Sequence, residues 1–527
     1  MSDSPVKCIG IDFGTTNTVV FCNDSNGKVI NLFKEGIKTA VFFHSREEIT
    51  IGQQALDFGL SDIRALATNF KPEIKEKVEY IAQNGDIIRT TNARIAEMFL
   101  DKLRSEYLEK KLKKYFGSAE LCNDDRVVIT VPAKFDEDEK LRVRTAASNA
   151  FFVSARAAFE PTAAAIAAAE GNNLLEERVI AVYDFGGGTF DISVIEKDRN
   201  ELFIPIERDG MRKGGNDITD AVLEQCVFKC LEKQGLFLST EDIEDLDFED
   251  NKAEDEFRRN VQICRNYVDN NVKYAFTEDN DEYAQPLFLY CNGERRQFDI
   301  KITRQEFDKA IRDIILETLN ITARTIGRVK KKGYTVTSLV LAGGSSQLRL
   351  VSKMLKDEFE AEGISICTPM NYDIFQLISR GALTIAQSER RIRVEEKTDA
   401  QFGIGTGTGI GRCLFEMLID ADVPLPVSSK TKTYPIPEEK RRVGEITIPC
   451  FRKDVKNYPD AKTNMDEGIN LINVYKLPFD PKSNPVSIDV IITIEADGTP
   501  SINAVLYDND GKAVMQFNDE MQFDCEV

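Results

Sequence analysis

The sequence predicts a large α/β domain over residues 1–388 and an all-β domain over residues 401–527. Up to about residue 388, apolar strand-like runs alternate with helix-like segments, which is the pattern of an α/β domain. From residue 401 on, the chain is punctuated by glycine and alternates apolar with polar residues, which favours β-structure. Residues 389–400, "ERRIRVEEKTDA", indicate a charged linker between the two. The 527-residue chain is also too long for one hydrophobic core.

The α/β assignment begins with "IGIDFGTTNTVV" (9–20), an apolar run interrupted by an acid, a glycine and two threonines, which predicts a β-hairpin. "RVVITVPAKF" (126–135) predicts a short strand that Pro132 ends. The segment 136–150 predicts a helix, because acids occupy its first turn, where the helix dipole favours them. A second helix is predicted over 160–171, with a proline near its start and a glycine at its end.

Two later segments complete the α/β domain. "RVIAVYDFGGGTFDISVIEKD" (178–198) predicts a strand, a glycine-rich turn and a second strand. "SLVLAGGSSQLRLVSKMLKDEF" (338–359) predicts a buried strand, a glycine-rich turn and a helix. In the all-β domain, residues 484–512 predict a hairpin with one buried face, because apolar residues alternate on both sides of an Asp-Gly turn.

Composition excludes several classes of function. The chain has 68 basic and 88 acidic residues and a formal net charge of −20, so we expect neither nucleic acid nor a membrane as a partner. The N-terminus "MSDSPVKC" lacks the features of a signal peptide, and eleven cysteines are scattered without CxxC pairs. Both observations favour a reducing, cytoplasmic location. The single histidine, His44, argues against histidine-based acid–base or zinc chemistry.

The chemistry is carried by two hairpins of the same design. "IGIDFGTTNTVV" and "VYDFGGGTFDIS" each contain an aspartate, Asp12 or Asp184, followed by glycine and threonine. Glycine lets backbone N–H groups approach a phosphate, and the two carboxylates can hold a hydrated divalent cation. A third glycine-rich turn, "AGGSSQ" (342–347), lies between a strand and a helix, where a nucleoside or phosphate can bind. The repetition predicts two duplicated halves that close on one nucleotide.

These segments resemble the seventy-kilodalton heat-shock chaperone (Hsp70) family. The resemblance is carried by "IGIDFGTTNTVV", "VVITVPAKFDEDEKLRVRTAAS", "FEPTAAAIAAAEG", "VYDFGGGTFDISVIE", "DGMRKGGNDITD", "ITRQEFDKAI", "LVLAGGSSQLRLV" and the β-domain run "IDADVPLPVSSKTKTYPI". It implies an actin-like ATPase domain, of the superfamily that includes actin and the sugar kinases, with two lobes around a nucleotide cleft. A small peptide-binding β-sandwich domain follows it.

The resemblance also implies site residues. Lys71, in "TNFKPEI", would neutralise charge on the transferring phosphoryl group and hold the attacking water, and Glu160 would polarise that water. Asp184 and Asp191 complete the catalytic set, while Asp12 and Asp184 would hold magnesium through water. The residues implied to bind ATP or ADP are Gly14, Thr15, Thr16, Asn17, Gly186, Gly187, Gly188, Thr189, Gly214, Gly215, Gln262, Arg265, Asn266, Gly343, Gly344, Ser345 and Gln347.

The chain departs from the family pattern where the base would bind. Gln347 stands where the family has an arginine that stacks on adenine, and Gln262, Arg265 and Asn266 stand where it has Glu, Lys and Arg. We therefore expect weaker nucleotide affinity and poorer discrimination of ATP from GTP. The apolar linker of the family is replaced by "RIRVEEKT". We also expect no helical lid after the β-domain, because the sequence ends at Val527 with "DCEV".

The resemblance implies an ATP-dependent molecular chaperone that binds unfolded or extended polypeptide and acts in protein folding and the stress response. Slow, magnesium-dependent ATP hydrolysis is implied, as are a J-domain co-chaperone and a nucleotide-exchange factor as partners. The alternative is a nucleotide-gated binding protein with little or no hydrolysis and one dedicated partner. A metabolite kinase of the same superfamily is disfavoured by the β-domain and by "EPTAAAIA".

Overall fold

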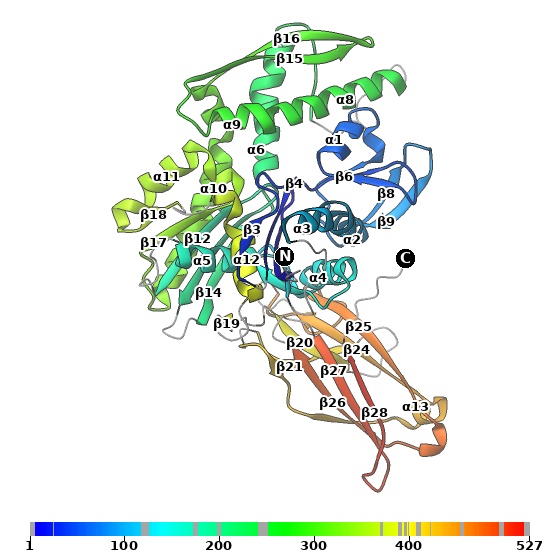
Figure 1. Cartoon of the computed structure of the whole chain (residues 1–527). Coiled ribbons are helices and arrows are strands. Elements are labelled where there is room, and N and C mark those ends of the chain that lie inside the picture. Colours follow the sequence, from blue (N-terminus) through cyan, green and yellow to red (C-terminus); the bar gives the residue numbers. More distant parts are fainter. Residues whose placement is uncertain are drawn as a thin grey trace. The chain divides into compact units, whose positions relative to one another are not determined.

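The computed structural model describes residues 6–24, 26–116, 126–171, 178–197, 202–240, 251–368, 373–387, 393–394, 398, 400–406, 413–421, 423–453, 458–494 and 500–520 (Figure 1). The chain divides into two compact units, residues 1–135 with 142–393, and residues 136–141 with 394–527. Most of the predicted linker, 389–400, lies outside the described residues. The predicted domain boundaries therefore stay a prediction.

The first unit contains two six-stranded sheets. The first sheet consists of β1 (Val6–Phe13), β2 (Asn17–Asp24), β3 (Val29–Asn31), β4 (Ile37–Lys38), β10 (Val127–Val131) and β11 (Arg156–Phe159). The second consists of β12 (Val179–Phe185), β13 (Phe190–Lys197), β14 (Leu202–Met211), β17 (Ser338–Ala342), β18 (Ser365–Cys367) and β19 (Arg393–Val394). Every residue of β10, β12 and β17 is buried, which explains why the sequences of these strands are continuous, mostly apolar runs.

The two sheets share the order and direction of five strands. In the first, the order is β11-β10-β1-β2-β3, where β1 and β2 form an antiparallel hairpin and β10 and β11 continue in parallel beside β1. In the second, the order is β18-β17-β12-β13-β14, with the same pattern of parallel and antiparallel pairs. Each sheet thus has one of the two predicted hairpins at its centre, and the expectation of a mixed α/β unit is confirmed.

Helices and smaller sheets complete this unit. The helices are α1 (Gln53–Gly59), α2 (Asn92–Lys102), α3 (Glu109–Phe116), α4 (Glu137–Phe151), α5 (Glu160–Gly171), α6 (Gly215–Val222), α7 (Phe228–Glu232), α8 (Asn251–Tyr267), α9 (Lys273–Ala275), α10 (Arg304–Lys331), α11 (Arg349–Phe359) and α12 (Leu377–Gln387). The smaller sheets are formed by β5 (Val41–Phe43) with β6 (Ile49–Ile51) and β7 (Leu66–Ala67), by β8 (Lys77–Ile81) with β9 (Ile87–Thr91), and by β15 (Glu282–Cys291) with β16 (Glu294–Thr303). The predicted helices over 136–150, 160–171 and the end of 338–359 are confirmed as α4, α5 and α11.

Helices α5 and α12 connect the two sheets. Helix α12 packs on β1 and on α5, and α5 in turn packs on β12 and β13 (Figure 1). The alanines of α5 are almost fully buried, so the two helices approach closely. A Cβ atom at Gly381 of α12 would lie 1.8 Å from the carbonyl oxygen of Ala163 in α5. This contact therefore requires glycine at position 381.

The second unit consists of two antiparallel sheets. One has the order β21-β20-β24-β25, formed by β20 (Gln401–Thr406), β21 (Leu414–Ile419), β24 (Glu445–Lys453) and β25 (Ile469–Pro478). The other is formed by β22 (Val427–Ser428), β23 (Lys432–Pro435), β26 (Ser487–Ile494), β27 (Pro500–Tyr507) and β28 (Ala513–Glu520). Apolar side chains of both sheets form one core, to which Phe402, Leu477, Val490 and Leu506 belong.

The hairpin predicted over residues 484–512 is confirmed as β26 and β27. Alternate residues of each strand are buried, and Val490 lies opposite Ala504 in the register. The Asp-Gly turn lies outside the described residues. The all-β expectation is wrong in one detail, because a short helix, α13 (Glu438–Val443), follows β23. Pro437 starts this helix, and Gly444 ends it with a φ of 77° in the left-handed region.

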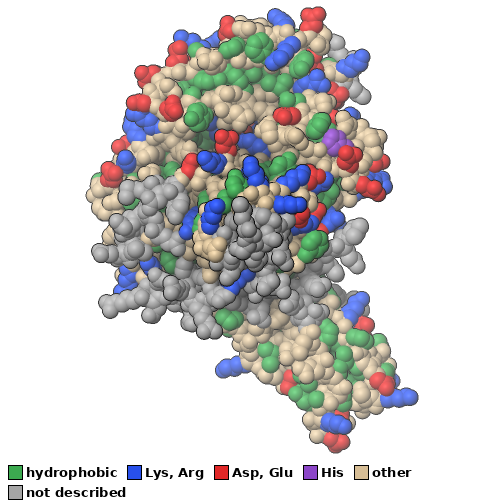
Figure 2. All heavy atoms as spheres, in the orientation of Figure 1, with side chains coloured by type: hydrophobic (Ala, Val, Ile, Leu, Met, Phe, Trp, Pro, Cys, Tyr) green, Lys and Arg blue, Asp and Glu red, His purple; other side chains and the backbone are tan. Residues whose placement is uncertain are grey.

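Acidic and basic side chains are interspersed over the face of the first unit in Figure 2. Among the described residues, no helix is both long enough and apolar enough to cross a lipid bilayer.

We expect Gly381→Ala to lower the free energy of unfolding of the first unit by about 1–3 kcal/mol or more, because the added methyl group would collide with backbone of α5. The matched control is Gly327→Ala in α10, where an added Cβ meets nothing within 4 Å. That change should stabilise the unit by roughly 0.5–1 kcal/mol, since alanine favours a helix over glycine. Scanning calorimetry of the full chain measures both. Equal transition temperatures for the two variants would contradict the close helix contact.

Candidate nucleotide-binding site

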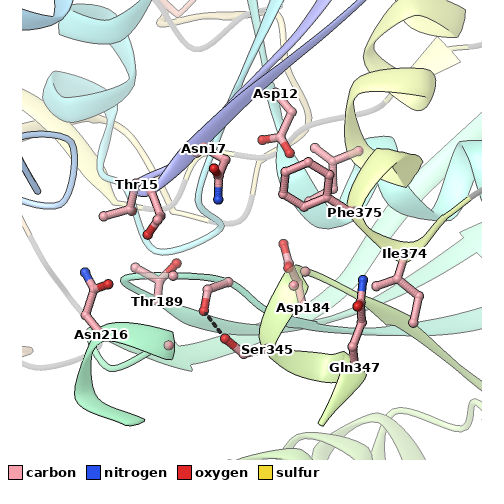
Figure 3. A pocket seen from close by; sticks show the side chains of 18 of the residues that line it. Asp12, Thr15, Asn17, Asp184, Thr189, Asn216, Ser345, Gln347, Ile374 and Phe375 are labelled. Carbon is pink, nitrogen blue, oxygen red and sulfur yellow. Dashed lines mark hydrogen bonds between the residues drawn. The ribbon is translucent and has the colours of Figure 1, made fainter. Parts of the chain in front are cut away.

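The two central hairpins end at one cavity of about 240 Å³ in the first unit (Figure 3). Residues from both sheets and from the helices that follow them form its walls. The lining comprises Asp12, Gly14, Thr15, Thr16, Asn17, Lys38, Lys71, Pro132, Glu160, Asp184, Gly186, Gly187, Thr189, Gly215, Asn216, Asp269, Lys273, Tyr274, Thr277, Gly343, Gly344, Ser345, Gln347, Leu348, Ile374, Phe375 and Ile378.

The tips of the hairpins lie against each other. A Cβ atom at Gly187, in the tip of β12–β13, would come within 2.3 Å of Thr16 Oγ1 in the tip of β1–β2. Only glycine permits this approach, and the same absence of side chains leaves backbone N–H groups accessible to a phosphate. The close contact gives a physical reason for the "GGG" run in the second hairpin.

The second tip is held by the two later glycine-rich turns. The carbonyl oxygen of Gly186 accepts hydrogen bonds from Gly215 N–H and from Ser345 Oγ, each at 2.9 Å (dashed line to Ser345 in Figure 3). Asn216 N–H donates to the carbonyl of Gly187 at 2.7 Å. Three segments that the sequence marks separately therefore form one continuous wall of the cavity.

Lys71 forms a buried ion pair on the cavity floor. Its side chain is 1% exposed, and Nζ lies 2.5 Å from Oε1 of Glu160, the first residue of α5. Lys71 Nζ also donates a hydrogen bond to the carbonyl oxygen of Phe13 at the end of β1. The helix dipole favours a carboxylate at the first turn, so α5 stabilises the charge on Glu160. The pair joins the first hairpin to the start of α5.

Three more carboxyl groups surround this pair. Burial, aided by the Glu160 carboxylate, raises the pKa of the Asp12 carboxyl to about 7, although Lys71 and a hydrogen bond from Thr130 oppose the shift. Burial and then Glu160 also raise the pKa of Asp191 to about 7. The pKa of Asp184 lies well above its usual range, because burial and the charges of Glu160, Asp191 and Asp12 all favour its neutral form.

Asp184 and Asp191 lie directly opposite each other on β12 and β13. Neither carboxylate oxygen of Asp191 has a hydrogen-bond partner within 3.5 Å among the described residues. The four acids Asp12, Glu160, Asp184 and Asp191 thus lie near one buried lysine, Lys71, so acidic groups outnumber basic ones in this cluster. A divalent cation fits this excess of carboxylate, and magnesium suits it because it usually keeps several of its waters and takes one or two carboxylates. Asp12 and Asp184 line the cavity and are the residues that would hold it.

The structure brings most of the predicted site residues together and leaves some outside. Lining the cavity are the predicted residues Asp12, Gly14, Thr15, Thr16, Asn17, Lys71, Glu160, Asp184, Gly186, Gly187, Thr189, Gly215, Gly343, Gly344, Ser345 and Gln347. Asp191 is buried beside Asp184, and Gly214 packs against the backbone of Gly187. Gly188 lines a neighbouring cavity instead.

Three predicted residues on α8 do not line the cavity. Gln262 Nε2 donates to Asn266 Oδ1 at 3.1 Å, and Arg265 pairs with Asp220 of α6 at 2.5 Å. Their polar groups are thus engaged with neighbours on the helices. The residues that follow on the same segment, Asp269 and Tyr274 among them, line the cavity in their place.

The remaining lining residues were not identified from the sequence. Lys38 lies opposite Asn17 in the pairing of β4 with β2, and Lys273 Nζ donates to the Gly215 carbonyl at 2.9 Å and to Asp269 Oδ1 at 2.7 Å. Ile374 and Phe375 come from a short 3₁₀ turn, η9 (Ile374–Gln376), just before α12. None of these four residues belongs to a glycine-rich motif, whereas Pro132, Asn216 and Leu348, which also line the cavity, lie within or directly beside the motifs quoted above.

Comparison with known proteins agrees with this geometry. The family model described as "Hsp70 protein" matches residues 8–519. The chain is 25% identical over 523 residues to the chaperone protein DnaK of Thermosipho melanesiensis, covering 96% of this chain and 79% of that protein. It is 24% identical over 522 residues to the DnaK proteins of Thermotoga petrophila and Thermotoga maritima, with the same coverage. By its sequence over nearly the whole length, the chain belongs to the Hsp70 family.

Proposed function

We propose that the protein is an ATP-dependent molecular chaperone, in which the first unit binds and slowly hydrolyses ATP and the second unit binds unfolded or extended polypeptide. Membership of the Hsp70 family supports ATP binding and a role in protein folding in general. The observation that carries the proposal is the single cavity at which two matching hairpin tips, the Lys71–Glu160 pair and the buried aspartates meet. The shared strand order of the two sheets supports an actin-like fold of two related lobes.

The residues of the cavity suit phosphoryl transfer to water. Backbone N–H groups of the tips at Thr15 and Gly187, which line the cavity, would bind the phosphates. Lys71, fixed by Glu160, would stabilise the charge that develops on the transferring phosphoryl group. Glu160 would orient the attacking water, and Asp191 would accept its proton or hold it through a second water.

Magnesium, when bound, would neutralise charge on the β- and γ-phosphates. Asp12 and Asp184 would orient its water shell rather than bind it directly, as the sequence predicts. Burial is the main cause of their raised pKa values, and repulsion from neighbouring carboxylates, Glu160 first among them, adds to it when no cation is present. A cation reverses that effect, which supports the proposed position.

The second unit is proposed to bind peptide as an additional extended strand held by side-chain contacts. Its two antiparallel sheets around one core, with the edge strands β21 and β25 in one of them, support a β-sandwich that can do so. A J-domain co-chaperone and a nucleotide-exchange factor are proposed as partners on the basis of the family alone. A cytoplasmic location is part of the same proposal.

We expect Lys71→Ala to reduce single-turnover ATP hydrolysis about 100-fold or more, because the lysine acts on charge that develops in the transition state. ATP binding, measured by calorimetric titration, should change far less, since the hairpin tips still provide their N–H groups. The matched control is Lys77→Ala, an exposed lysine on β8 that should leave both properties unchanged. Hydrolysis at the normal rate by Lys71→Ala would show that another residue has the catalytic role.

A further prediction concerns how ATP changes the release of a bound peptide. The family's apolar linker is charged here, and its residues Arg393–Val394 form β19 beside β14 at the edge of the second sheet. This bound state of the linker buries less apolar surface than an apolar linker would, so we propose that it is less populated than in the family. We expect ATP to change the dissociation rate of a fluorescent extended apolar peptide by less than about tenfold.

Replacing Arg391 and Arg393 together by leucine should enlarge that response, because it restores apolar surface to the linker. Acceleration of about a hundredfold by ATP in the unaltered chain would contradict the prediction. So would a double variant that responds no more strongly than the unaltered chain.

A further inference from the structure

The proposed function places the phosphates of the nucleotide at one end of the cavity, the phosphate end, and its base at the other, the base end. The hairpin tips and the Lys71–Glu160 pair mark the phosphate end. At the other end, the turn η7 (Gly344–Gln347) and the turn η9 supply Gln347, Ile374 and Phe375. Figure 3 shows these three side chains together on one side of the cavity, away from Thr15, Thr189 and Asn216.

Asp373 organises this end. Its Oδ1 accepts a hydrogen bond from Gln347 Nε2 at 3.2 Å and another from Phe375 N–H at 3.1 Å. One carboxylate oxygen therefore fixes both the Gln347 amide and the backbone that carries the Phe375 ring. The amide that stands where the family has a stacking arginine is turned toward Asp373, and it has no charge to place over a base.

The Phe375 ring lies between two glycine turns. A Cβ atom at Gly36 would lie 3.1 Å from its Cζ atom, and one at Gly344 would lie 4.0 Å from its Cδ2 atom. Because both neighbours are glycines, no side chain at these positions covers the ring. Ile374 packs against the hydrophobic core beneath the second sheet, whereas Phe375 is only half-buried, does not belong to that core and lines the cavity.

We propose that Phe375 is the residue on which the base of the bound nucleotide stacks, in place of the absent arginine. This inference rests on the proposed function, because it assumes that the cavity binds a nucleotide. An aromatic ring offers stacking surface without a charge and accepts any base, since every base has a π-face. The sequence shows only that the base end lacks residues that the family has there. The Phe375 ring gives this end an aromatic surface, and it allows both adenine and guanine to bind.

The chain provides a direct test, because it contains no tryptophan. Phe375→Trp makes a protein with one tryptophan, whose fluorescence should be quenched when ATP and magnesium bind and the base stacks on the indole. The matched control is Phe237→Trp, at a phenylalanine that is 71% exposed and does not line the cavity. Its fluorescence should not respond to ATP.

A second variant separates the base from the phosphates. Phe375→Ala should weaken ATP binding by about 5- to 150-fold, the range measured for loss of one base–aromatic stack. Binding of inorganic tripolyphosphate, which has no base, should stay within about twofold of the unaltered chain, because the hairpin tips are unchanged. GTP should lose affinity as ATP does.

The outcomes are distinguishable. The assignment is supported if ATP quenches the fluorescence of Phe375→Trp but not that of Phe237→Trp, and if Phe375→Ala loses affinity for ATP and GTP but not for tripolyphosphate. Equal ATP affinity of Phe375→Ala and the unaltered chain, or fluorescence of Phe375→Trp that does not respond to saturating ATP, overturns it while the proposed function stands. If the unaltered chain binds neither ATP nor tripolyphosphate, the proposed function fails and this inference fails with it. Should Phe375→Ala not fold, the fluorescence of Phe375→Trp decides alone.

Discussion

The cavity depends on the contact between two hairpin tips that are about 170 residues apart in the chain. The tip of β12–β13 meets the tip of β1–β2 with no space for a Cβ atom between Gly187 and Thr16. That contact brings Asp12 and Asp184, at the ends of β1 and β12, to the same cavity. The packing of α12 on α5 fixes the two sheets in a position where the tips can meet. A side chain at Gly187 would push the two tips apart.

The electrostatics of the cavity follow from that contact. Four acids, Asp12, Glu160, Asp184 and Asp191, lie around the buried ammonium of Lys71. Burial first, and then repulsion from neighbouring carboxylates, raises the pKa of Asp12, Asp184 and Asp191. Such an arrangement costs stability in the empty protein, because buried carboxyl groups lose hydration. In the proposed function, a nucleotide with bound magnesium would relieve this repulsion.

Much of the fold follows from local patterns in the sequence, while the base end of the cavity does not. The strands β10, β12 and β17 are continuous, mostly apolar and fully buried, so the sequence pattern predicts them. Helix α5 is predicted from the residues at its start and its end. The hairpin tips are likewise predicted, because their glycine-rich motifs can be recognised in the sequence, although the contacts that require glycine there, such as Gly187 with Thr16, are tertiary. Phe375 has no such signal, since its role depends on Gly36 and Gln347, which are distant in the sequence and which only the tertiary structure places near it and near Asp373. The residues on α8 were expected at the base from the resemblance, yet their side chains pair with their helical neighbours.

In the proposed function, this cavity hydrolyses ATP and does not merely bind it. Single-turnover hydrolysis measures this most directly, with excess unaltered protein, labelled ATP and magnesium, and with an identical reaction in which the magnesium is chelated. We expect slow, complete conversion of bound ATP to ADP and phosphate with magnesium, and little conversion without it. Bound ATP that is recovered intact in the presence of magnesium would contradict hydrolysis at this cavity. It would instead favour a nucleotide-gated binding protein with one dedicated partner.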